Sequence, residues 1–121
     1  LGDSFHRAAD EHMLQTLASE SNLIAEARLV GYLARELPDA LRVFCDCPLE
    51  VRAARSIERE PGFSLDKALA RIAERDQADT ENFRQLYGID YHHRAYYDLI
   101  LDTSVLDPTG VADAILAAAE A

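Results

Sequence analysis

The sequence predicts an α/β fold in which helices flank a parallel sheet. Two compact apolar runs, at 41–47 and 96–103, contain the β-branched and aromatic residues typical of strands, and 21–27 is predicted as a short third strand. Segments with helical periodicity separate these strands, so crossovers must connect them, and crossovers make neighbouring strands parallel. A chain of 121 residues suffices for one domain, which we expect to span residues 1–121.

Apolar spacing and local breakers define the helices. Pro48 suits the first turn of a helix, because the N–H that proline lacks is unbonded there in any case. The Pro-Gly pair at 61–62 breaks the next polar stretch, and Ser64 is a candidate N-cap for the helix that follows. Residues 48–86 are therefore predicted to form a two-helix arm. The predicted helices span 6–19, 48–60, 65–86 and 107–121, with a helical turn at 31–37 and a loop at 87–96.

The basic residues are concentrated in this arm. The formal net charge is −10, yet residues 52–84 hold seven of the twelve Lys and Arg residues alongside seven acids. Arginine suits phosphate binding, because its planar fork grips phosphate oxygens and keeps its charge. A hairpin of solvated, salt-bridged helices is the alternative interpretation. The side chains form two stripes at helical spacing: Arg52, Arg55 and Arg59 on one helix, and Arg71, Arg75 and Asp79 on the next.

Composition argues against several functions. Strong acidity disfavours general nucleic-acid binding and binding to an anionic membrane surface, because both need a basic face. No apolar run approaches the roughly 18 residues of a membrane span, and the N-terminal residues lack the apolar centre of a signal peptide. A binding partner among nucleic acids or membranes is therefore not expected.

Cysteines and histidines offer no clear metal site. Cys45 and Cys47 point to the same face of a predicted strand, and we expect reduced thiols packed in a cytoplasmic core. Their spacing is not that of zinc knuckles, so no protein-bound metal is expected. Packing accounts for His92 and His93 in the loop at 87–96, with nucleobase stacking as the alternative.

Four pieces of the sequence occur in an order and spacing shared with a known family. They are EARLVG (26–31) with PDALRVF (38–44), PLEVRAAR (48–55), IAERDQAD (72–79) and YGID with YDLILDTS (87–90 and 97–104). Together they resemble the C-terminal two-thirds of a cytidylate kinase, most closely the archaeal and cytidylate kinase-like branches of the nucleoside monophosphate kinases. The resemblance covers about residues 22–108 and rests on the set, because no single piece is specific.

The resemblance implies a P-loop kinase-like fold and a reaction, the transfer of phosphate from ATP, with Mg²⁺, to CMP or dCMP in the complete protein. Residues 48–86 would be a helical lid. The alternative is a non-catalytic kinase-like module that binds a nucleotide or a protein partner. The implied site residues are Arg28 near the monophosphate, Arg75 on its phosphate, Asp79 on the nucleotide, and Arg52, Arg55 and Arg59 as lid arginines over the transferring phosphates.

The sequence lacks the P-loop, G-x-x-x-x-G-K-[ST], with which the family cradles ATP phosphates. None of the glycines precedes a lysine, and the single lysine, Lys67, lies within a predicted helix. We therefore expect this chain alone to bind neither ATP nor Mg²⁺ and to be inactive. In the family's sheet the P-loop strand lies between strands equivalent to 22–27 and 41–47. Its absence is expected to leave unpaired edges, completed by an upstream segment or by a homo-oligomer.

Other positions also depart from the family pattern. Ala27 stands where glycine is usual, Leu29 where bacterial members place an aspartate, and Asn82 where a further arginine is expected. The sequence therefore does not determine the base of the acceptor. A different P-loop small-molecule kinase stays a further alternative. The chain begins at Leu1 with its only methionine at Met13, from which we expect part of a longer polypeptide.

Overall fold

The predicted α/β fold, with a parallel sheet and flanking helices, is confirmed. The structure, a computed structural model, describes residues 3–121, with side chains from residue 7 onward. Within that range β1 and β2 form one two-stranded parallel sheet, in which Val43 pairs with Leu99 and Asp46 with Asp102. The elements are α1 (Asp3–Ser19), α2 (Val30–Leu33), β1 (Val43–Asp46), α3 (Leu49–Arg59), α4 (Leu65–Tyr87), a 3₁₀ turn (Arg94–Tyr96), β2 (Leu99–Asp102) and α5 (Pro108–Glu120).

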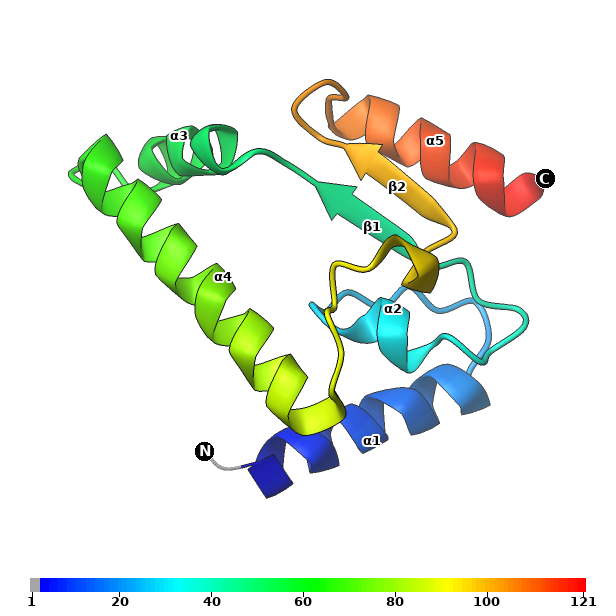
Figure 1. Cartoon of the computed structure of the whole chain (residues 1–121). Coiled ribbons are helices and arrows are strands. Elements are labelled where there is room, and N and C mark those ends of the chain that lie inside the picture. Colours follow the sequence, from blue (N-terminus) through cyan, green and yellow to red (C-terminus); the bar gives the residue numbers. More distant parts are fainter. Residues whose placement is uncertain (1–2) are drawn as a thin grey trace.

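The helices are arranged unevenly around the sheet (Figure 1). α5 lies along β2, whereas α3 and α4 form an arm that leaves the carboxyl end of β1 and returns toward α1. α1 crosses the far end of α4, where the Tyr87 hydroxyl donates a hydrogen bond to Asp10 at 2.6 Å. None of the described helices combines the length and apolar character that a membrane crossing requires.

Local sequence signals set the helix ends. The Ser64 side chain accepts a hydrogen bond from the backbone N–H of Lys67 at 3.2 Å, so the predicted N-cap of α4 is confirmed. Gly88 ends α4 in the left-handed region at φ 67°, a conformation that costs glycine little. Asp107 caps α5 by accepting from the N–H of Gly110 at 2.7 Å.

The predicted strand at 21–27 is wrong, because this segment has no strand structure. The other two strands are shorter than predicted and span only 43–46 and 99–102. A strand is stable only with a hydrogen-bonded neighbour, and β1 pairs with β2 rather than with this segment. Ile24 is accordingly 96% exposed. An apolar run alone could not reveal that the pairing partner is missing.

β1 keeps one open edge. The carbonyl groups of Arg42 and Asp46 accept hydrogen bonds from Leu99 and Thr103, on the side of β2. Because backbone directions alternate along a strand, Val43 and Cys45 direct their N–H and C=O groups to the opposite edge. No strand of the described chain pairs there, so β1 presents unbonded backbone groups of the kind that attract another strand.

This geometry also corrects the prediction for the cysteines. Both thiols are free, but Cys45 is exposed and Cys47 is only half-buried, so neither is packed in a core. In a sheet of two strands, β1 is an edge strand whose side chains are covered less than those of a central strand. The buried core lies elsewhere, around Leu29, Leu33, Phe83 and Tyr91.

Candidate functional site

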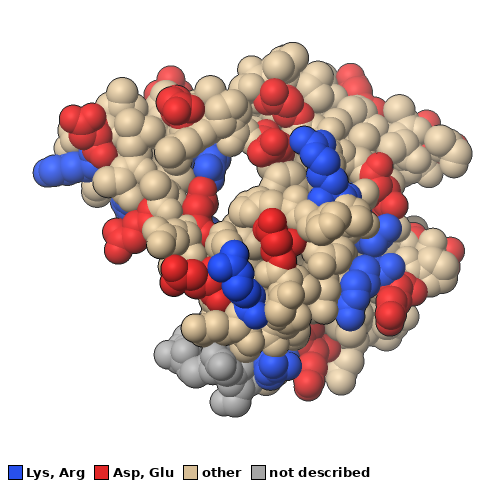
Figure 2. Space-filling view, viewed as in Figure 1, with Lys and Arg blue, Asp and Glu red and all other residues tan. Residues whose placement is uncertain are grey.

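Two adjoining cavities lie against α4. The first, of about 700 Å³, separates residues 25–28 from β1, and we call it the sheet cavity. The second, of about 420 Å³, lies between α1 and α4, and we call it the α1 cavity. Arg28 and Arg75 line both, so the two cavities share a wall. Figure 2 shows the molecule hollowed between the arm and the sheet, with acidic and basic side chains around the rim.

Arg52 is the residue of α3 that lines the sheet cavity. It projects from α3 and makes a bidentate ion pair with Asp76 of α4, with Nη1–Oδ1 at 3.2 Å and Nη2–Oδ2 at 2.7 Å. The hydrogen bond with Asp76 raises the pKa of Arg52 above its ordinary value. Its Nε atom is buried and has no hydrogen-bond partner in the described structure. Arg52 is therefore a guanidinium that Asp76 holds in place at the wall of the sheet cavity.

The remaining lid arginines of the prediction lie differently. Arg55 reaches the loop after β2, where it donates to the Thr103 carbonyl at 2.5 Å and to the Thr103 hydroxyl at 3.2 Å. Arg59 lines neither described cavity. Arg71, of the second stripe, pairs with Glu60 at 3.2 Å near the tip of the arm. The two stripes thus meet in the sheet cavity only through Arg52 and Arg75.

The predicted monophosphate residues gather in the α1 cavity. Arg28, just before α2, forms an ion pair with Asp79 of α4, and Arg75 stands one helical turn before Asp79. Arg75 makes no ion pair with any described side chain. Asn82 and Phe83 continue the same wall. This arrangement provides two guanidinium groups and a carboxylate within one small cavity.

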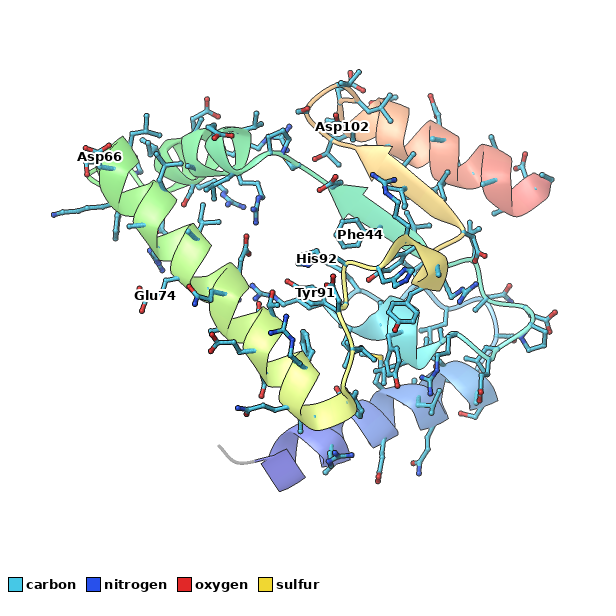
Figure 3. All side chains as sticks on the ribbon, viewed as in Figure 1. Phe44, Asp66, Glu74, Tyr91, His92 and Asp102 are labelled. Carbon is cyan, nitrogen blue, oxygen red and sulfur yellow. The ribbon has the colours of Figure 1, made fainter. Side chains whose placement is uncertain are left out.

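Aromatic side chains form the opposite wall of the sheet cavity, and sequence reasoning had considered one of them, His92, for nucleobase stacking only as an alternative. The ring centroids of Phe44 and Tyr97 are 4.9 Å apart, and His92 lies edge-on to Phe44 at 5.8 Å. Figure 3 shows Phe44, Tyr91 and His92 grouped in the space between β1 and α4. The dense run of aromatic residues and histidines at 91–97 was a signal, but the face that it covers depends on long-range packing.

Tyr97 provides a pH test of this wall. Its hydroxyl donates to the Tyr91 carbonyl at 2.6 Å, and burial raises its pKa to about 12, against about 10 in an unfolded chain. Since the folded pKa is the higher one, the contribution to stability is complete below about pH 10 and is lost as the pH rises toward 12. We expect urea unfolding to show that loss, and Tyr97→Phe to show less of it. Equal losses in both proteins would contradict the assignment.

Comparison with known proteins identifies the family of this chain. The model of the cytidylate kinase-like family matches residues 2–105. The chain belongs to the cytidylate kinase-like family. The prediction from the four sequence pieces is thereby confirmed.

Several named relatives extend the comparison. A cytidylate kinase of Pyrococcus abyssi is 38% identical over 105 residues, which cover 87% of this chain and 56% of the relative. One of Sulfolobus acidocaldarius is 37% identical over 107 residues, covering 88% and 58%, and one of Methanosarcina barkeri is 33% identical over 100 residues, covering 83% and 56%. The chain thus spans about half the length of the curated relatives it matches. No solved structure matches it.

Proposed function

We propose that this chain is the acceptor-binding and lid part of a cytidylate kinase-like phosphotransferase, which in the complete protein transfers phosphate from ATP to CMP or dCMP. The observation that carries the proposal is the α1 cavity, where Arg28, Arg75 and Asp79 meet. Its volume lies within the range of about 300–1,000 Å³ that small-molecule pockets occupy. The relatives named cytidylate kinases support the choice of acceptor. The proposed location is the cytoplasm.

Each residue has a role that its chemistry supports. Arg75 and Arg28 would hold the phosphate of the acceptor, because guanidinium groups form charge-assisted hydrogen bonds with phosphate oxygens. Asp79 would accept a hydrogen bond from a nucleoside hydroxyl. Because Asp79 also pairs with Arg28, the incoming phosphate would compete with this carboxylate for the guanidinium.

We propose the segment 48–86 as the lid of a single domain spanning 1–121. Phosphoryl transfer depends on positioning and on neutralising charge at the phosphate oxygens, and a closing lid strengthens both by excluding water. Arg52 already reaches the sheet cavity. Arg55 and Arg59 stay proposed as lid arginines, and Arg55 would have to leave Thr103 to serve.

The described residues do not fit the phosphates of ATP. The single lysine, Lys67, lies in the first turn of α4 at the tip of the arm and lines neither cavity. Across residues 7–121 no group of three or more His, Cys, Asp and Glu side chains is placed to hold a metal ion. ATP and Mg²⁺ therefore belong to the proposal only for the complete protein, and no catalytic step is assigned to this chain.

The proposal predicts binding of CMP to this chain. Calorimetry should detect it, and Arg75→Ala should weaken it at least about tenfold, because a charge-assisted hydrogen bond contributes about 1.5–3 kcal/mol. Arg84→Ala is the matched control, since Arg84 lies on the same helix but lines neither cavity. Unchanged affinity in Arg75→Ala, or equal losses in both variants, would reject the assignment.

The second candidate is a non-catalytic kinase-like module that binds a nucleotide or a protein partner. The lack of an ATP cradle among the described residues favours it. A coupled assay with ATP and the full-length protein separates the two, with CMP, UMP, AMP and shikimate-like acceptors compared in parallel. Turnover with CMP supports the kinase, turnover with another acceptor a different small-molecule kinase, and turnover with none the module.

A further inference from the structure

The ion pair between Arg52 and Asp76 uses only part of the N–H groups of the guanidinium. Asp76 accepts from Nη1 and Nη2, which form the end of the fork. Each terminal nitrogen carries a second N–H that can still bind an oxyanion, since a guanidinium carries more N–H donors than one carboxylate accepts. The Nε atom is buried without a hydrogen-bond partner in the described structure. The side chain as a whole is 37% exposed, so an anion can reach the terminal nitrogens but not Nε.

The surroundings of Arg52 suit a phosphate-bearing anion. Arg52 lines the sheet cavity close to the carboxyl end of β1, the end of a parallel sheet at which α/β proteins bind ligands. Arginines balance acids around the cavity, and His92 adds a titratable group. The charged side chains lining it are Arg28, Arg52, Arg75, Glu26, Asp46 and Asp76. Because the fixed charges balance, affinity for an anion depends on where the guanidinium groups point rather than on net charge.

We propose that Asp76 is a positioning residue, which holds Arg52 across the arm so that the free N–H groups of its terminal nitrogens face a phosphate-bearing anion in the sheet cavity. The inference rests on the proposed function, because it requires such a ligand. The guanidinium of Arg52 lies at the end of a long, flexible side chain. A free side chain of this kind loses much conformational entropy when it binds a ligand. The ion pair with Asp76 restricts the side chain before the ligand binds, so less entropy is lost on binding, as in other preorganised sites.

The sign of one substitution separates this role from a purely electrostatic one. Asp76→Asn removes a negative charge beside the proposed anion, so Coulomb's law alone predicts tighter binding. Loss of positioning predicts weaker binding, because the amide cannot make a charged, bidentate pair with Arg52. The two effects therefore have opposite directions.

The chain also offers a matched structural control. Glu60, the residue that follows α3, and Arg71 of α4 form a second ion pair within the arm, at 3.2 Å. Neither residue lines the sheet cavity. Glu60→Gln therefore removes an ion pair from the same helical arm without touching the proposed anion site. If Asp76 served only to stabilise the arm, the two substitutions would act alike.

The test measures the binding of pyrophosphate to the full chain by calorimetry. We expect Asp76→Asn to weaken it about threefold to tenfold and Glu60→Gln to leave it unchanged. In an Arg52→Ala background, Asp76→Asn should cause no further weakening. Unchanged or tighter binding in Asp76→Asn, or equal weakening by Glu60→Gln, would overturn the proposal. So would a wild-type chain that does not bind pyrophosphate.

A second measurement needs no ligand. The Nε–H proton of Arg52 should give a slowly exchanging NMR signal, assigned by its loss in Arg52→Lys. We expect this signal to broaden or vanish in Asp76→Asn and to persist in Glu60→Gln. A signal that persists in Asp76→Asn would show that the carboxylate does not hold the guanidinium. CMP binding in the α1 cavity reports separately on the proposed function, so failure of either proposal can be recognised.

Discussion

Replacing Gly31 with alanine is expected to lower the free energy of unfolding by about 2 kcal/mol or more. Gly31 is buried in α2, and a Cβ atom there would overlap Cε1 of Tyr97 and lie 2.8 Å from its Cδ1. The ring packs against Phe44 and is tied to the Tyr91 carbonyl through its hydroxyl. It cannot retreat without losing these contacts, and overpacking of this kind costs about 1–3 kcal/mol.

Urea unfolding followed by circular dichroism measures this loss. The matched variant is Gly31→Ala combined with Tyr97→Leu, in which the smaller side chain makes room for the added methyl group. The double variant should be more stable than the sum of the two single effects predicts, because the residues are in contact. An alanine variant as stable as the wild type would show that the close approach of Gly31 and Tyr97 is not a constraint.

The isolated chain is expected to self-associate at micromolar concentration or to melt at low temperature. The open edge of β1 supplies unbonded backbone groups. The apolar side chains of Leu23 and Ile24 are 42% and 96% exposed, and they directly precede residues 25–28, which line the sheet cavity opposite β1. Light scattering over a concentration series should report a rising mass. A monodisperse monomer with a cooperative thermal transition would contradict this expectation.

One substitution tests the edge itself. Cys45 directs its N–H away from β2, so Cys45→Pro removes an edge donor and leaves the β1–β2 hydrogen bonds in place, as proline is tolerated on such edges. We expect Cys45→Pro to shift the chain toward a monomer. Cys45→Ala keeps the N–H and should associate like the wild type. Equal association in both variants would show that the edge is not the contact.

The parts of the fold that depend on neighbours in sequence were predictable. Pro48 and Ser64 placed the starts of the two arm helices within a residue, because caps act over three or four residues. The strand at 21–27 was not predictable in the same way, since a strand exists through its partner. An apolar run predicts the side chains of a strand but not the presence of the neighbouring backbone.

In the candidate site, too, local features were predictable and long-range contacts were not. Helical spacing predicted two stripes on the arm, and one arginine of each, Arg52 and Arg75, lines the sheet cavity. No local pattern distinguishes Asp76 from the other acids of the arm, and only the crossing of α3 and α4 selects it as the partner of Arg52. The contact of Arg55 with Thr103 joins residues 48 positions apart, a separation that no local pattern encodes.

The register of the sheet bears on how this chain folds. Val43 pairs with Leu99 across the entire arm, and closing so long a loop carries a large entropy cost. The arm closes over much shorter separations, such as the 11 positions between Glu60 and Arg71. Low contact order favours rapid formation, so the hairpin of helices can condense while the strands are still apart. During that interval intramolecular pairing competes with collisions between chains, and the outcome depends on concentration and on the speed of synthesis.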